Sequence, residues 1–576
     1  MKVSDYIADE LAEQRVPAVF ELVGGMITHL LDSIHVRGTI PIISMRHEQG
    51  AAFAAEGCAR MSGIPAVAMA TSGPGATNLL TGIGSCYFDS TPAVFITGQV
   101  NRSEQKRDRE IRQLGFQETD IVSMAAAVTK RAWRVEDEAQ VPAILREAFH
   151  LASTGRRGPV LVDVPMDIQR AQIDPPGPVP HPGTPSTGLS EADAITIREA
   201  LISARKPMIL AGGGIRTSNA TVEFRNLVCT AGLPVVHSLM GVDLLAYADP
   251  LNAGMIGSYG NRWANLALSQ CDCLIVLGSR LDVRQTGADT RSFKGQRPIF
   301  HVDCEKGELN NRIENCHVFV SDLAPAMDML AAVLAPVADS LRKLVEPWQD
   351  AIASLRNQWP DTGELATAQG INPNSFMHDL SRALPDVAAY VADVGQHQMW
   401  AAQSLELSTE QRFLTSGGMG SMGFALPASI GAAVCSQNRP VVVIAGDGGF
   451  QCNIQELQTI AHFNLPIKIV VLNNQCHGMV RQFQESYFDG RYQSTMWGYS
   501  APEFVKVSEA FGIPARLIGE KTGVQGGIEW LAQHSGGPCL LEVAIPQLTN
   551  AYPKLAFGHG LDSMEPFVKP LDMEGT

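Results

Sequence analysis

A glycine-rich turn between two apolar runs most constrains how this chain can fold. The first run, residues 441–445, leads into the sequence GDGG at residues 446–449, and the second, residues 467–472, ends on two asparagines. Residues 453–463, between the runs, have a helical pattern. Strand, turn, helix and strand form a βαβ crossover, whose parallel strands end at the same edge of one sheet. We therefore expect Asp447 and Asn474 to lie close together.

The residue types at that edge suit a metal ion and a phosphate. A carboxylate and an amide oxygen are ligands that a hard divalent cation such as Mg²⁺ prefers. Glycines allow backbone N–H groups to approach an anion, most naturally a diphosphate bridged to the metal. An ordinary crossover, in which the Asp and Asn only cap turns, would show the same local pattern. Both interpretations stay open from this stretch alone.

The totals of the chain limit its function class. A length of 576 residues indicates about three or four domains, and a net charge of −15 argues against nucleic-acid binding. Residues 1–15 resemble neither a signal nor a transit peptide, and no long uncharged apolar window predicts a membrane span. The eleven scattered cysteines favour reduced thiols. We expect a cytoplasmic protein that binds neither nucleic acid nor membrane.

Helical and strand-like segments alternate along the whole chain. This rhythm predicts an α/β fold built on doubly wound parallel sheets. Residues 174–188 are rich in proline and glycine, which predicts a semi-rigid linker, and residues 337–359 form a charged helical connector. We therefore place three domains at residues 1–173, 189–336 and 370–576.

Four segments together resemble the signature of a known enzyme family. They are GDG followed after 24 residues by Asn473-Asn474, RHEQ at 46–49, TSGPGATN at 71–78, and TSGGMGSMG at 415–423. The set resembles the thiamine-diphosphate enzymes, and over essentially the whole chain it resembles the large subunit of acetohydroxyacid (acetolactate) synthases. The resemblance implies a pyrimidine-binding, a central FAD-binding-like and a diphosphate-binding domain, in that order.

The resemblance also implies an activity. Such an enzyme is a transferase, a carboligase that decarboxylates pyruvate and passes the two-carbon unit to a keto acid or ketone. Its implied cofactors are thiamine diphosphate, Mg²⁺ and FAD, the last in a structural role. In this family the thiamine site lies between two subunits, which implies a homodimer or a homotetramer.

Residues for the thiamine site follow from matching positions. Asp447, Asn474 and the carbonyl of Cys476 would hold Mg²⁺, and Glu48 would exchange a proton with the aminopyrimidine ring. Met422 would support the bent cofactor from below, where a plain core methionine is the alternative. Further cofactor contacts are implied for Gly73, Asn78, Gly420, Gly446, Gly448, Gly449, His477, Gly478 and Met479.

Two more residues are implied near the reaction centre. Gly25 would bring its backbone close to it, and Gln117 would donate to the oxygen of the intermediate. A turn glycine and a surface glutamine stay open as alternatives.

The central block carries glycine-rich strand ends that could admit a dinucleotide. Glycines after a strand and an acid at a strand end are typical of such sites, although they also punctuate other doubly wound sheets. The resemblance implies FAD contacts at Arg156, Gly212, Gly213, Arg280, Asp303 and Asp322. It further implies that Arg284 binds the carboxylate of an acceptor in a bidentate contact.

The acceptor side departs from the family pattern. Acetohydroxyacid synthases have tryptophan in place of Phe483 and lysine in place of Met166; Phe116 and Val480 complete the predicted acceptor set. Loss of the lysine weakens the case for a second keto acid, whereas Arg284 favours it. An alternative acceptor is a nucleotide-linked keto-deoxysugar, and a flavin-dependent pyruvate oxidase is an alternative activity.

Overall fold

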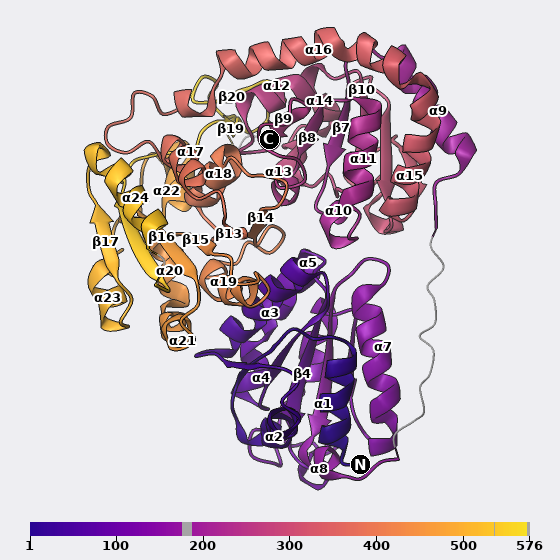
Figure 1. The fold of residues 1–576 in the computed structure, drawn as a ribbon, viewed down its shortest axis with the longest axis vertical. Coiled ribbons are helices and arrows are strands. Elements are labelled where there is room, and N and C mark those ends of the chain that lie inside the picture. Colours follow the sequence, from indigo (N-terminus) through magenta and orange to yellow (C-terminus); the bar gives the residue numbers. More distant parts are fainter. Residues whose placement is uncertain (175–186, 535, 573–576) are drawn as a thin grey trace.

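The computed structural model describes residues 1–174, 187–534 and 536–572. This part of the chain contains three six-stranded sheets, and all of their strand pairs are parallel (Figure 1). Helices cover the sheets, which confirms the predicted α/β class with three parallel sheets. Most of the proline-rich linker lies outside the described residues, and the domain limits that we infer from composition stay predictions.

The N-terminal sheet has the strand order β2-β1-β3-β4-β6-β5. Its strands are β1 (Val19–Leu22), β2 (Ile42–Ser44), β3 (Ala66–Ala70), β4 (Ala93–Gln99), β5 (Arg131–Arg134) and β6 (Pro159–Pro165). Its helices are α1 (Val3–Glu13), α2 (Thr28–Arg37), α3 (Glu48–Ser62), α4 (Pro74–Asn78), α5 (Leu80–Phe88), α6 (Ile121–Ala125), α7 (Val141–Ser153) and α8 (Met166–Arg170). Buried alanines and β-branched residues fill both faces of its central strands, as expected of a covered parallel sheet.

The central sheet has the order β12-β11-β10-β7-β8-β9. Its strands are β7 (Pro207–Ala211), β8 (Val235–His237), β9 (Asn252–Met255), β10 (Cys273–Leu277), β11 (Ile299–Asp303) and β12 (His317–Val320). Its helices are α9 (Glu191–Ser203), α10 (Gly214–Thr217), α11 (Thr221–Ala231), α12 (Arg262–Gln270), α13 (Val283–Thr286), α14 (Thr290–Lys294), α15 (Leu323–Leu334) and the long α16 (Ala338–Gln358).

The C-terminal sheet has the order β14-β13-β15-β16-β18-β17. Its strands are β13 (Ala389–Ala392), β14 (Arg412–Thr415), β15 (Val441–Gly446), β16 (Ile467–Asn473), β17 (Ala515–Ile518) and β18 (Cys539–Ala544). Its helices are α17 (Pro373–Ala383), α18 (Gln396–Ser404), α19 (Ala425–Val434), α20 (Asp447–Cys452), α21 (Leu457–His462), α22 (Gly478–Tyr487), α23 (Phe504–Ala510) and α24 (Val524–Gln533). A small hairpin follows, β19 (Lys554–Leu555) with β20 (Met564–Glu565).

The predicted crossover is present, but its helix differs from the expectation. Strands β15 and β16 pair in parallel, with Gly446 opposite Leu472. The expected helical segment over residues 453–463 is present as a 3-10 turn (Ile454–Glu456) and helix α21, but a further short helix, α20, begins at Asp447 and ends before Asn453. The amide of Asn453 donates to the carbonyl of Gly423 and to Gln49, and this contact with distant segments accompanies the break before α21.

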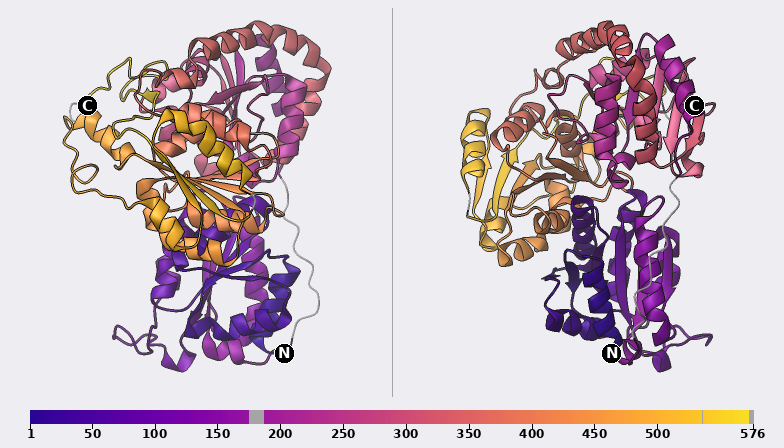
Figure 2. Two further views of the ribbon diagram at one scale, coloured as in Figure 1. Left: turned by 60° about the vertical axis from the view of Figure 1, so that its left-hand side comes forward. Right: turned by 45° about the vertical axis from the view of Figure 1, so that its right-hand side comes forward.

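Helices α3 and α19 join the N-terminal and C-terminal sheets into one hydrophobic core (Figure 2). They approach closely because glycines face the crossing: a Cβ on Gly57 would lie 2.1 Å from the carbonyl oxygen of Ala428, and one on Gly431 would lie 1.8 Å from that of Ala54. The contact therefore tolerates no side chain at either glycine.

A buried ionic cluster joins the central domain to the N-terminal and C-terminal domains. Asp243 accepts hydrogen bonds from Arg216 at 3.1 Å and from Arg412 of β14 at 2.9 Å, and Arg412 also donates to the carbonyl of Arg60 on α3. Burial alone would raise the pKa of Asp243, but the two guanidinium groups outweigh it and lower that pKa to about 2. Asp243 thus joins the central and C-terminal domains, and Arg412 extends the contact to the N-terminal domain.

The helical run Leu323–Gly363 is long and apolar enough to cross a membrane by length and composition alone. Its apolar part is α15, whose residues Ala326, Met327, Leu330 and Leu334 are buried in the core of the central domain. One face of α15 therefore packs on the core of the central domain, and about a third of the most apolar window of the run is buried.

Replacing Gly57 by alanine should lower the apparent melting temperature clearly. The new methyl group would overlap a backbone oxygen of α19, and overpacking of this kind costs about 1–3 kcal/mol. Thermal unfolding monitored by circular dichroism measures the effect. The matched control is Gly526→Ala on α24, where a Cβ meets no atom within 4 Å, and that change should be neutral or slightly stabilising. Equal melting temperatures for both variants would contradict the tight crossing.

Candidate functional site

A cavity of about 310 Å³ opens at the carboxyl edge of the C-terminal sheet. It lies where β15 and β16 end, as the crossover argument predicts. The predicted residues that line it are Met422, Gly446, Asp447, Gly448, Gly449, Asn474, Cys476, His477, Gly478, Met479 and Val480. The structure therefore brings together most of the residues that the sequence assigns to the diphosphate and the metal.

Asp447 is buried at the end of β15, with 2% of its surface exposed. The hydroxyl of Tyr499 donates to its Oδ2 atom at 2.9 Å. Burial raises the pKa of Asp447 to about 6, although hydrogen bonds from Tyr499 and from the backbone of Gly448 and Cys476 act in the opposite direction. Across the cavity edge, the amide oxygen of Asn474 accepts from the backbone N–H of Cys476 at 3.3 Å.

The donor set of this edge fits a cation only together with a phosphate ligand. Among the residues that the structure describes, no cluster of three or more His, Cys, Asp or Glu side chains could hold a metal ion. One carboxylate, an amide oxygen and a backbone carbonyl leave positions for phosphate oxygens and water, as Mg²⁺ usually requires. Gly448 must stay a glycine, because a Cβ there would lie 2.6 Å from the ring of His477.

The sequence reasoning missed a second turn that lines the same cavity. Strand β13, the neighbour of β15, ends in the sequence DVGQH at residues 393–397, of which Val394 to His397 line the cavity. Burial lowers the pKa of His397 to about 3, so its ring is neutral at pH 7. Within the described residues its Nε2 atom has no hydrogen-bond partner. The signal was available: an apolar strand, a glycine turn and a helix start repeat the pattern of residues 441–449.

Asp393 organises the floor of the cavity. Its buried carboxylate accepts the backbone N–H groups of Val394 at 2.8 Å, Gly423 at 2.9 Å and Ala425 at 2.9 Å. Two of these donors, Gly423 and Ala425, closely follow Met422 in the chain. Asp393 therefore ties the end of β13 to the segment that follows Met422, a role that the sequence alone did not reveal.

The predicted N-terminal residues gather around the loop of residues 71–78. Asn78 donates to the Oε2 atom of Glu48 at 2.9 Å, and a Cβ on Gly73 would lie 3.0 Å from that of Gln117. The backbone N–H of Met26, next to Gly25, donates to Thr71 at 3.3 Å. No described residue of the N-terminal sheet domain lines the cavity of about 310 Å³.

The residues predicted for the acceptor lie in several places. Phe116 is 81% exposed, and Met166 begins α8. Val480 lines the cavity, and Phe483 lies one turn later on α22, where its ring is 4.8 Å from that of Tyr487. The structure does not bring this set together within one chain. Gly420 lines neither cavity, although its φ of +68° needs a glycine.

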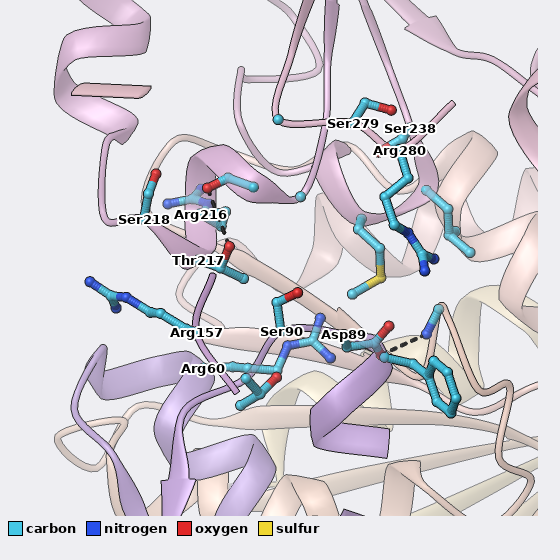
Figure 3. A pocket seen from close by; sticks show the side chains of 18 of the residues that line it. Arg60, Asp89, Ser90, Arg157, Arg216, Thr217, Ser218, Ser238, Ser279 and Arg280 are labelled. Carbon is cyan, nitrogen blue, oxygen red and sulfur yellow. Dashed lines mark hydrogen bonds between the residues drawn. The ribbon is translucent and has the colours of Figure 1, made fainter. Parts of the chain in front are cut away.

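A second cavity of about 410 Å³ lies where the three sheet domains meet (Figure 3). The predicted FAD contacts that line it are Arg156, Gly213, Arg280, Asp303 and Asp322. Gly212 is absent from the lining and packs behind it, since its Cβ would lie 2.1 Å from the carbonyl oxygen of Gly278. Arg284 also lines this cavity rather than the first. Polar side chains such as Arg60, Arg157, Arg216 and Ser238 were not predicted and complete the wall.

Comparisons with known proteins agree with this arrangement. Three family models match in order: the N-terminal TPP binding domain of thiamine pyrophosphate enzymes at residues 1–124, their central domain at 195–330, and their C-terminal TPP binding domain at 393–543. The chain is 37% identical to the large subunit of acetolactate synthase isozyme 2 from Escherichia coli, over 96% of this chain and 97% of that protein. It is 36% identical to an acetolactate synthase from Arthrospira platensis, over 97% and 96%, and 35% identical to an acetolactate synthase large subunit from Lactococcus lactis, over 97% and 95%.

Asp393→Asn should weaken both the fold and the cavity. The amide that replaces one carboxylate oxygen would face a backbone N–H, and an unsatisfied buried group costs about 1–3 kcal/mol. We expect a lower apparent melting temperature and weaker binding of thiamine diphosphate in a calorimetric titration. The control Asp489→Asn changes a side chain that is 90% exposed, so its effect should stay within about 0.5 kcal/mol. If both variants behaved alike, Asp393 would not organise the cavity.

Proposed function

Because the chain belongs to the thiamine pyrophosphate enzymes, and among them to the acetolactate synthase large-subunit family, we propose that it decarboxylates pyruvate and joins the remaining two-carbon unit to a carbonyl acceptor. The observation that carries this proposal is the cavity at the end of β15 and β16, with Asp447, Asn474 and bare glycines on its walls. Its substrates are small molecules, and the enzyme is a transferase of the carboligase type.

The cavity residues have separate tasks in this proposal. Asp447, Asn474 and the carbonyl of Cys476 hold Mg²⁺, and Gly448 and Gly449 leave the diphosphate room beside it. The buried turn at Gln396 and His397 supplies further polar contacts. Thiamine diphosphate, when bound, supplies the carbanion centre that takes up and releases the two-carbon unit. Met422 gives that cofactor an apolar support.

Glu48 moves the proton that activates the cofactor. Its carboxylate is held by Asn78 at 2.9 Å and would meet a ring nitrogen of the aminopyrimidine. Gln117, on the same loop cluster, would donate to the developing oxyanion, with Gly25 leaving its backbone accessible. These roles depend on a cofactor that reaches from the cavity to the N-terminal domain of another subunit.

The second cavity suits FAD. It offers guanidinium groups for the pyrophosphate and carboxylates at two strand ends for the ribose and adenine side. The carboligation has no net redox step, so the flavin would have a structural role. Arg284 lines this cavity, so a contact with an acceptor carboxylate would be made from the flavin side.

A homodimer, or a homotetramer, would complete the thiamine site. The N-terminal set and the C-terminal cavity stay apart within one chain, which supports a site shared by two copies. The eleven free cysteines support a reducing compartment such as the cytoplasm.

Mixing two inactive variants tests the shared site. Glu48→Gln and Asp447→Asn should each abolish turnover of pyruvate, because each disables one half of the site. In a mixed dimer one site carries both changes and the other carries none, so co-refolded protein should recover about a quarter of wild-type activity on random pairing. Carbon dioxide release from labelled pyruvate is the readout. No recovery would show that each site is built from a single chain.

The acceptor remains the variable half of the reaction. Arg284 favours a 2-keto acid, whereas the apolar Met166 and the aromatic group of Phe483, Tyr487 and Phe488 favour an uncharged ketone. A nucleotide-linked keto-deoxysugar is therefore the second candidate acceptor. A pyruvate oxidase would instead pass electrons to FAD.

A panel of acceptors separates these possibilities. Labelled pyruvate is supplied with 2-keto acids, simple ketones and a nucleotide-linked keto-sugar, and the products are identified by mass spectrometry. We expect carbon–carbon bond formation with at least one acceptor. Under anaerobic conditions we expect the flavin to stay oxidised, and therefore unbleached, when pyruvate is added. Flavin reduction by pyruvate alone would favour the oxidase. Exchange of Phe483 for tryptophan should shift the acceptor preference toward keto acids and leave pyruvate decarboxylation unchanged.

A further inference from the structure

The segment that follows α22 is fixed over the cavity by hydrogen bonds. The backbone N–H of His477 donates to the carbonyl of Thr495 at 3.1 Å, and Gln484 on α22 donates to the carbonyl of Gln493 at 3.0 Å. Gln493, Ser494 and Thr495 line the cavity as a result. The segment therefore has a defined position above the end of β15.

Tyr499, at the end of this segment, reaches the buried carboxylate. Its hydroxyl donates to Oδ2 of Asp447 at 2.9 Å and accepts from Gln451 at 3.3 Å. Gln451 also donates to the backbone carbonyl of Asp447 at 3.1 Å, and the Tyr499 ring lies 4.5 Å from the His477 ring at 66°. Two side chains thus hold the hydroxyl in place, one through a hydrogen bond and one through ring packing.

The contact occupies one of the two carboxylate oxygens. With Oδ2 already accepting from Tyr499, the contact disfavours binding of a cation to both oxygens of Asp447 at once. Mg²⁺ requires near-octahedral geometry and takes carboxylates through one oxygen, whereas the larger Ca²⁺ readily accepts both. The orientation of Asp447 therefore bears on which cation the site prefers.

We propose that Tyr499 is a positioning residue that holds Asp447 as a one-oxygen ligand and thereby makes the site selective for Mg²⁺ over larger cations. The inference rests on the proposed thiamine-diphosphate site and adds a determinant of its cation preference. It assigns Tyr499 no contact with the substrate.

The test compares cation affinities of the full-length protein. Wild type and Tyr499→Phe are saturated with thiamine diphosphate and titrated separately with Mg²⁺ and Ca²⁺, with calorimetry as the readout. Loss of the hydrogen bond lets the carboxylate rotate, so we expect Mg²⁺ to bind about tenfold more weakly in the variant, and Ca²⁺ to change by less than about twofold. The ratio of the two affinities, rather than activity, is the result that counts.

Tyr492→Phe is the matched control. It removes a phenol hydroxyl from the same segment, but its ring packs against Trp497 and not against His477. It should leave both affinities unchanged, and thermal unfolding checks that each variant is folded. Equal weakening of both cations in Tyr499→Phe, or no change in either, would overturn the selectivity role while the cofactor site stands. Wild-type protein that binds neither cation with thiamine diphosphate would overturn the proposed site itself.

Discussion

The crossing of α3 and α19 is the contact on which the rest of the structure depends. Gly57 and Gly431 let the two backbones touch, and the resulting core is shared by the N-terminal and C-terminal sheets. Helix α3 begins at Glu48, and α19 follows the segment that carries Met422. The crossing therefore sets the positions of Glu48 and Met422 relative to one another within the chain.

Two buried carboxylates, Asp243 and Asp393, hold separate segments of the chain together. Two arginines hold the pKa of Asp243 low, at about 2, and Asp243 connects the central domain to β14. Asp393 is held mainly by backbone N–H groups, and burial raises its pKa to about 6. The difference follows from their surroundings: guanidinium partners favour the charge strongly, whereas neutral donors compensate only part of the desolvation.

Features that depend on a short stretch of the chain could be predicted from the sequence. Asp447 and Asn474 come together because parallel strands of a crossover end at one edge, and that rule needs only residues 441–474. Helix α20, which precedes Asn453, was missed, and the contacts that Asn453 makes at its end, with Gln49 and Gly423, come from distant segments. Tyr499 was missed because its contact with Asp447 spans 52 positions of irregular chain. Arg284 was assigned to the acceptor by resemblance, and only the packing of α13 shows that it lines the cavity between the domains.

The exposure of Phe116 has a consequence for how the protein behaves in dilute solution. Phe116, next to Gln117, is 81% exposed. Covering its ring by a second copy of the chain would remove apolar surface from water and so stabilise the pair. If the thiamine site is shared as proposed, the covering copy also completes it. Catalytic competence would then follow the concentration of the chain by mass action, so that dilution acts on this enzyme as an inhibitor would.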